Sequence, residues 1–129
     1  MRPELHLQKA VRIENAMRKL TDADYEAVIE ASMLAGTHWF NIALHRIGLA
    51  EPEVDVMHAE FLDGAQRRVL SIHAPLILNA LDEIESYRTG FVRGDLEGGA
   101  KVAARCRELL KVLRDAAPRV QALVSALDE

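Results

Sequence analysis

The stretch KVAARCRELLKVLRDAAPRVQALVSAL, residues 101–127, decides the fold class, because its apolar side chains recur in alternating steps of three and four. The residues on this spacing are Ala103, Cys106, Leu110, Leu113, Ala117, Val120, Val124 and Leu127. Such spacing places one apolar stripe along a helix and predicts that this helix packs against others. Asp95 is a good N-cap for it, and we expect Pro118 to kink it, because proline lacks a backbone N–H.

Four more helices are predicted upstream, since apolar residues recur with helical spacing and no segment alternates as a strand does. They cover residues 3–20, residues 21–47 up to a terminating Gly48, a third helix from near Val54, and a fourth from Pro75 to about residue 90. On the third helix we expect buried Val54, Met57, Phe61, Ala65, Val69 and Ile72. Pro75 disfavours helical geometry at Ala74, so the chain should break there.

Short connections between amphipathic helices favour antiparallel neighbours. The sequence therefore predicts an all-α, up-and-down antiparallel bundle of four to five helices, formed as a single domain by residues 1–129. A chain of 129 residues has the usual length of one domain.

Composition narrows the function classes. Acidic residues number 20 against 16 basic ones, for a net charge of −4, so a strongly basic nucleic-acid footprint is absent overall and only a local basic patch is compatible with this balance. We expect no DNA partner. No apolar run reaches the roughly 18–20 residues of a membrane span, and the N-terminus lacks the apolar core of a secretion signal. The lone Cys106 excludes an intramolecular disulfide and fits a reducing cytoplasm, and its place on the apolar stripe predicts a buried, inert thiol.

Histidines raise the question of a metal. His38, Asn41 and His45 lie at positions i, i+3 and i+7 and form a polar stripe, to which His58 and Glu60 could add ligands from the next helix. The helical Glu-x-x-His pairs of di-iron bundles do not occur in the sequence. We therefore expect no metal and no cofactor, with a metal-dependent bundle that uses His38, His45 and His58 as the weaker hypothesis.

A second group of residues suits phosphate chemistry. Four residues separate Arg68 from His73, and five separate Arg67 from His73. An imidazole can move protons at an RNA 2′-hydroxyl, and a guanidinium can stabilise charge on the scissile phosphate, without a metal. In a continuous helix residues five apart point about 140° from each other, so convergence requires a break near Pro75 or a second chain. The alternative is that both arginines are solvated and that His73 caps a helix junction.

The order of the helices resembles the HEPN superfamily of small helical-bundle proteins. The resemblance is carried by residues 37–46, THWFNIALHR, by residues 81–91, LDEIESYRTGF, and by the helix that follows, within residues 20–115. In nuclease members of that superfamily, an Arg is followed by four to six residues and a His in a dimer cleft. The family usually has a polar residue after this Arg; Val69 follows Arg68, so only Arg67 fits on that point.

The resemblance implies one of two functions. One is a non-catalytic homodimeric module that binds a partner protein, such as a minimal nucleotidyltransferase, or a nucleotide ligand. The alternative is a metal-independent endoribonuclease, the toxin of a toxin–antitoxin pair, with RNA as substrate and Arg68, Arg67 and His73 as the site. We favour the binding module, because the apolar stripe of the last helix is longer than a compact bundle of this size requires and could pack on a second subunit.

Overall fold

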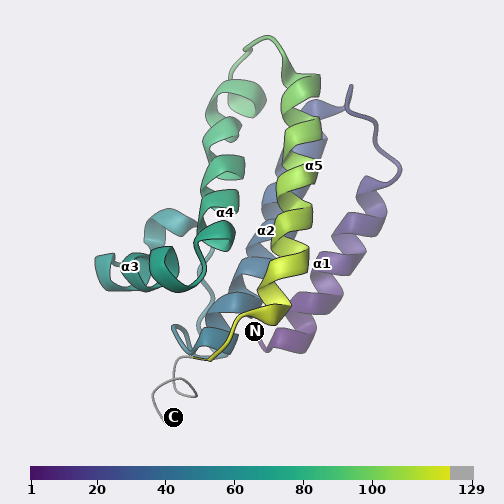
Figure 1. Cartoon of the computed structure of the whole chain (residues 1–129). Helices are drawn as coiled ribbons and strands as arrows, with labels where there is room; N and C mark the ends of the chain where they lie inside the picture. The colour runs from purple at the N-terminus through teal and green to yellow at the C-terminus, as the bar shows by residue number, and fades with distance from the viewer. Residues whose placement is uncertain (123–129) are drawn as a thin grey trace.

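The computed structural model describes residues 1–122 and shows a bundle of helices (Figure 1). Its α-helices are α1 (Pro3–Met17), α2 (Tyr25–Ile47), α3 (Gly64–His73), α4 (Pro75–Arg88) and α5 (Gly99–Ala116), with short helical turns η1 (Ala59–Phe61), η2 (Thr89–Arg93) and η3 (Ala117–Arg119). Helices α1, α2, α4 and α5 run alternately up and down, and α3 projects to the side of the start of α4 (Figure 1). The predicted all-α bundle is confirmed. None of the helices described is both long and apolar enough to cross a membrane.

Helix α2 lies at the centre and packs against α1, α4 and α5. It buries the apolar residues expected from the sequence, which are Ile29, Met33, Phe40, Leu44 and Ile47. A Cβ on Gly36 would lie 3.1 Å from Leu113 Cδ1, so this glycine lets α5 approach closely. The helix ends at Gly48, whose φ of +90° is the left-handed conformation that glycine adopts readily, as predicted.

The first two helices are shorter than predicted at their facing ends. Helix α1 stops at Met17 rather than at residue 20, and α2 starts at Tyr25 rather than at Thr21. The carboxylate of Asp24 accepts hydrogen bonds from the backbone N–H and the hydroxyl of Thr21, at 2.9 and 3.3 Å. These bonds stabilise a turn that precedes α2, at the position where the first turn of this helix was predicted.

The prediction for the third helix was wrong in its start and its buried face. Helix α3 begins only at Gly64, because Asp63 and Gln66 form a capping box in which each side chain bonds the other's backbone N–H. The preceding segment instead buries Val56, Ala59 and Leu62, and α3 buries Leu70. Of the residues expected in the core, Val54, Met57, Phe61, Ala65 and Ile72 are exposed and Val69 is half-buried.

The break at Pro75 is confirmed. Ala74 adopts φ −145° and ψ 53°, outside the helical region, and α4 starts at the proline itself. After this change of direction α3 packs against α4 and projects to the side of the bundle (Figure 1).

Helix α5 confirms the apolar stripe but not its limits. Ala103, Cys106, Leu110, Leu113 and Ala117 are buried, and Val120 is half-buried. The helix starts at Gly99 after a left-handed Gly98, not at Asp95. A Cβ on Gly99 would collide with the ring of Tyr25, so the close approach of this ring requires a glycine at the first position of the helix. Pro118 lies in η3 and follows the end of α5 instead of kinking it. Val124 and Leu127 lie outside the described residues.

Replacing Leu113 by Ala should lower the free energy of unfolding by about 2–5 kcal/mol, because the fully buried side chain leaves a cavity between α5 and α2. The half-exposed Val11 is the matched control, and Val11→Ala should change stability by less than about 0.5 kcal/mol. Urea unfolding followed by circular dichroism measures both. Equal effects of the two substitutions would contradict this description of the core.

Candidate functional site

Nitrogen atoms from three parts of the chain surround one carboxylate oxygen. Asp55 Oδ1, on the loop after α2, lies 2.9 Å from His6 Nε2 of α1 and 3.3 Å from His45 Nε2 near the end of α2. The N-terminal amine of Met1 lies 3.0 Å from the same oxygen. We call His6, His38, His45 and Asp55 the histidine cluster; the histidine side chains facing Asp55 are only 2% exposed, and that of Asp55 is 25% exposed.

The loop is fixed over α2 by a buried amide. Asn41 accepts a hydrogen bond of 2.7 Å from the backbone N–H of Val56 and donates one of 2.8 Å to the carbonyl of the same residue. Its amide nitrogen also lies 2.8 Å from the carbonyl of Thr37. A buried amide that satisfies both backbone groups of one residue is stable in place, so Asn41 sets the position of the neighbouring Asp55.

The protonation of His45 follows from its second contact. His45 Nδ1 lies 3.0 Å from the carbonyl oxygen of Ala50, which can only accept. Nδ1 therefore carries the proton, and in the neutral ring Nε2 presents its lone pair towards Asp55. This contact depends on Gly48, since its left-handed turn reverses the chain so that Ala50 comes back beside His45.

His6 and His38 form a second link. Their Nδ1 atoms lie 2.9 Å apart, so one ring donates and the other accepts. Two imidazolium rings could not make this contact, since each Nδ1 would carry a proton. Burial lowers the pKa of both His6 and His38, and each also faces another positive group when protonated.

Asp55 is held as a carboxylate. Burial by itself would raise its pKa, but hydrogen bonds from the N-terminal amine and from His6 outweigh burial and leave the pKa below its usual value. The cluster at neutral pH therefore combines a negative carboxylate with neutral rings at His6 and His38.

The residues predicted for ribonuclease chemistry are not brought together within the chain. Arg67 forms a two-pronged ion pair with Asp82 of α4, at 2.9 and 3.0 Å, which raises the pKa of its guanidinium. Arg68 and His73 are exposed on α3, a continuous helix on which their positions point about 140° apart. A catalytic role for Arg67, Arg68 and His73 stays a prediction.

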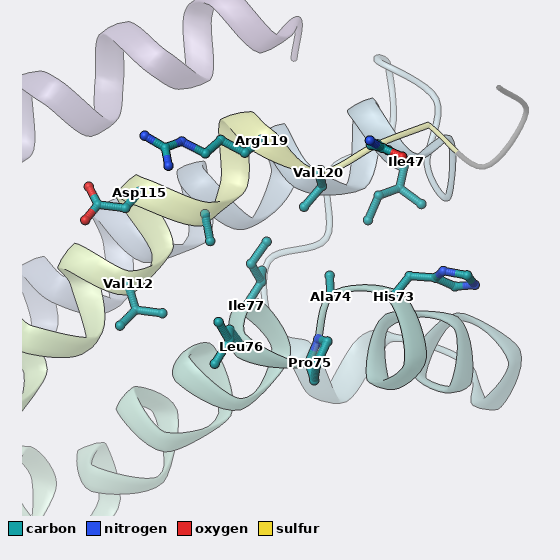
Figure 2. Close-up of a pocket in the computed structure, with 12 residues that line it drawn as sticks. Ile47, His73, Ala74, Pro75, Leu76, Ile77, Val112, Asp115, Arg119 and Val120 are labelled. Carbon is teal, nitrogen blue, oxygen red and sulfur yellow. The ribbon is translucent and has the colours of Figure 1, made fainter. Parts of the chain in front are cut away.

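His73 does lie at the mouth of a groove. The groove has a volume of about 780 Å³ and runs between the start of α4 and the end of α5. Its lining is mostly aliphatic and includes Ile47, Ala74, Leu76, Ile77, Val112 and Val120, with His73, Asp115 and Arg119 as its ionisable members. The ring of His73 and the guanidinium of Arg119 point outward on opposite sides (Figure 2). The groove thus presents apolar surface between polar edges.

Two other predicted residues have local roles. His58 Nδ1 lies 2.8 Å from Glu85 Oε1 of α4 without hydrogen-bond alignment, so His58 is apart from the cluster that His38 and His45 join. The predicted burial of Cys106 is confirmed, and burial raises the pKa of its thiol to about 12, so the thiol is protonated at neutral pH.

Sequence reasoning found half of the histidine cluster. His38 and His45 were singled out because they share a face of one helix, whereas His6 and Asp55 come from other segments and stand alone in the sequence. The one available signal was His6 itself, a titratable residue three positions after the helix-starting Pro3 and four before the core residue Ala10. That spacing places His6 on the buried face of α1.

Comparison with known proteins gives no matching family model, curated protein or solved structure for this chain. The HEPN resemblance therefore stays a prediction.

The histidine cluster predicts that acid destabilises the protein. In the unfolded chain a histidine has its ordinary pKa of about 6.5, whereas burial lowers the pKa of His6 and His38 in the folded protein. Below that pH the unfolded chain binds more protons, so the free energy of unfolding should be constant above about pH 6.5 and fall as pH drops towards the lowered values.

Urea unfolding between about pH 5 and pH 7.5 measures this slope. His38→Gln should make the slope shallower, because one lowered pKa is removed, and the exposed His73→Gln should leave it unchanged. A slope that is the same in all three proteins would show that the cluster does not control the acid sensitivity.

Proposed function

We propose that this protein is a non-catalytic binding module that acts as a homodimer, with the groove between α4 and α5 as its self-association surface. The observation that carries the proposal is an aliphatic groove edged by large apolar side chains exposed to water. Leu76, in the groove lining, is 66% exposed, and Ile72, at the end of α3, is 67% exposed. Burying each of them fully would contribute roughly 1.5–3 kcal/mol.

The shape of α3 supports the same surface. This helix projects from the bundle (Figure 1) and buries only Leu70 completely. Phe61, just before it, is 65% exposed. Helices in proteins draw most of their stability from a buried apolar face. Because α3 buries little apolar surface against its own chain, packing against a second molecule would stabilise it further.

The edge of the groove favours a second copy over a nucleotide. Asp115 and Arg119 are both exposed there and have opposite charges. In a two-fold dimer each residue of such a pair can face the other residue of the partner, so the edge is complementary to itself. A nucleotide would require several donors for its phosphates, and the lining is predominantly aliphatic. A nucleotidyltransferase-type protein, as the HEPN resemblance implies, remains our prediction for the partner of the dimer.

Light scattering coupled to gel filtration, over a dilution series, tests the dimer. Ile72→Asp and Leu76→Asp should each raise the dissociation constant more than tenfold, since burying an unpaired carboxylate costs more than the ~1.4 kcal/mol that a factor of ten represents. Val11→Asp introduces the same charge at a half-exposed position of α1 and should leave the dimer intact. A monomeric parent, or a dimer lost only in Val11→Asp, would refute the proposed surface.

The absence of catalysis is tested separately. Parent and His73→Ala proteins are incubated with mixed cellular RNA in excess EDTA, and we expect identical, uncleaved RNA from both. Cleavage by the parent that His73→Ala abolishes would replace the binding module with the metal-independent ribonuclease, and Arg67→Ala and Arg68→Ala would then show which arginine serves it.

A further inference from the structure

We propose that His6, His45 and Asp55 form a binding site for a divalent transition-metal ion, with zinc as the preferred metal. Each residue offers one ligand atom, and these atoms all lie within 4.8 Å of one another. Two imidazole nitrogens and one carboxylate oxygen are a common ligand set for zinc, with a further position left for water. The site goes beyond the proposed function and shares no residue with the groove.

The spacing of the ligand atoms suits a tetrahedral ion. Ligands at roughly 2.0–2.1 Å from a tetrahedral zinc lie about 3.3–3.4 Å from one another. His45 Nε2 and Asp55 Oδ1 are already 3.3 Å apart, and His6 Nε2 and Asp55 Oδ1 are 2.9 Å apart. The second pair has to separate slightly, and a rotation of the partly exposed Asp55 side chain can supply this movement.

The outer contacts of both histidines favour metal binding through Nε2. His45 Nδ1–H donates a hydrogen bond to the carbonyl of Ala50. Nδ1 of His6 lies 2.9 Å from Nδ1 of His38, which would accept the Nδ1–H of His6 when a metal occupies Nε2. A metal-binding histidine usually holds its second nitrogen in this way, which fixes the tautomer and the direction of the ring. In neutral His45 the Nε2 lone pair faces a carboxylate oxygen, an arrangement that repels unless a cation lies between them.

The burial and the charge of the three ligand residues also suit a metal ion. The side chains of His6 and His45 are 2% exposed, so they are held in position, whereas Asp55 is 25% exposed and leaves a path from solvent. The carboxylate supplies one negative charge, and each imidazole would bind the metal through Nε2 in its neutral form. His38 acts as a positioning residue, since it contacts His6 and not the ligand atoms.

Metal binding is measured on full-length protein without a histidine tag, after EDTA treatment and removal of the chelator. Titration with Zn²⁺ by calorimetry should give one ion per chain, and Co²⁺ should give the visible absorption of a tetrahedral site. At a zinc concentration ~100-fold above the dissociation constant, the Tm should rise by about 5–10 °C.

Matched variants separate this site from other histidines. Asp55→Asn and His45→Gln should each weaken Zn²⁺ binding at least tenfold and remove the Co²⁺ spectrum, and His38→Gln should weaken binding by about 10-fold through position alone. His58→Gln and His73→Gln should bind as the parent does. Asp55→Asn is isosteric and partly exposed, so it decides the matter if His45→Gln fails to fold, as judged by circular dichroism.

Three results would overturn the proposal: no Zn²⁺ bound by the parent, equal affinity in the parent and in folded Asp55→Asn, or a loss of binding in His73→Gln instead. The oligomeric state of the same preparations is unaffected by these outcomes, so failure of the metal site and failure of the dimer are distinguishable.

Discussion

The pair of hydrogen bonds between Asn41 and the backbone of Val56 determines where the long loop after α2 lies. Asn41 is 1% exposed, and its amide bonds both the carbonyl and the N–H of this one residue. Asp55 is the neighbour of that residue, so the same bonds place its carboxylate between α1 and α2. An apolar residue at position 41 could pack in the core, but it would leave two buried backbone groups of Val56 without partners. The histidine cluster therefore depends on a polar residue inside the apolar centre of the bundle.

The fold was predictable where a local sequence signal determines whether a helix forms or ends. The stripe of α5 and the proline at residue 75 act locally, and the structure contains the helix and the break that they predict. Residues 54–61 show the opposite case, because their apolar spacing fits a helix but the capping box at Asp63 starts α3 later. The expected core residues Met57 and Phe61 are consequently exposed. The capping box is a local signal carried by Asp63 and Gln66, and helical periodicity of the apolar residues does not report it.

The candidate site was predictable only within single helices. Residues at i and i+7 share a face wherever a helix forms, which is why His38 and His45 were recognised together. His6 joins them because α1 packs on α2, and Asp55 joins them because Asn41 holds the loop. Neither of these two tertiary contacts produces a recognisable residue spacing in the sequence. For the Arg67–Arg68–His73 group the spacing was visible, but a continuous α3 separates Arg68 and His73 around its axis, and Asp82 engages Arg67.

The two candidate surfaces depart from the usual distribution of residues in opposite directions. At the histidine cluster, groups that prefer water are buried, and at the groove, aliphatic groups that avoid water are exposed. Each departure costs stability in an isolated chain, since polar groups lose hydration when buried and exposed apolar surface gains nothing from folding. A bound cation would offset the first cost, because it satisfies the lone pairs that face one another, and a second copy would offset the second. Both costs therefore point to binding, and they point to chemically different ligands.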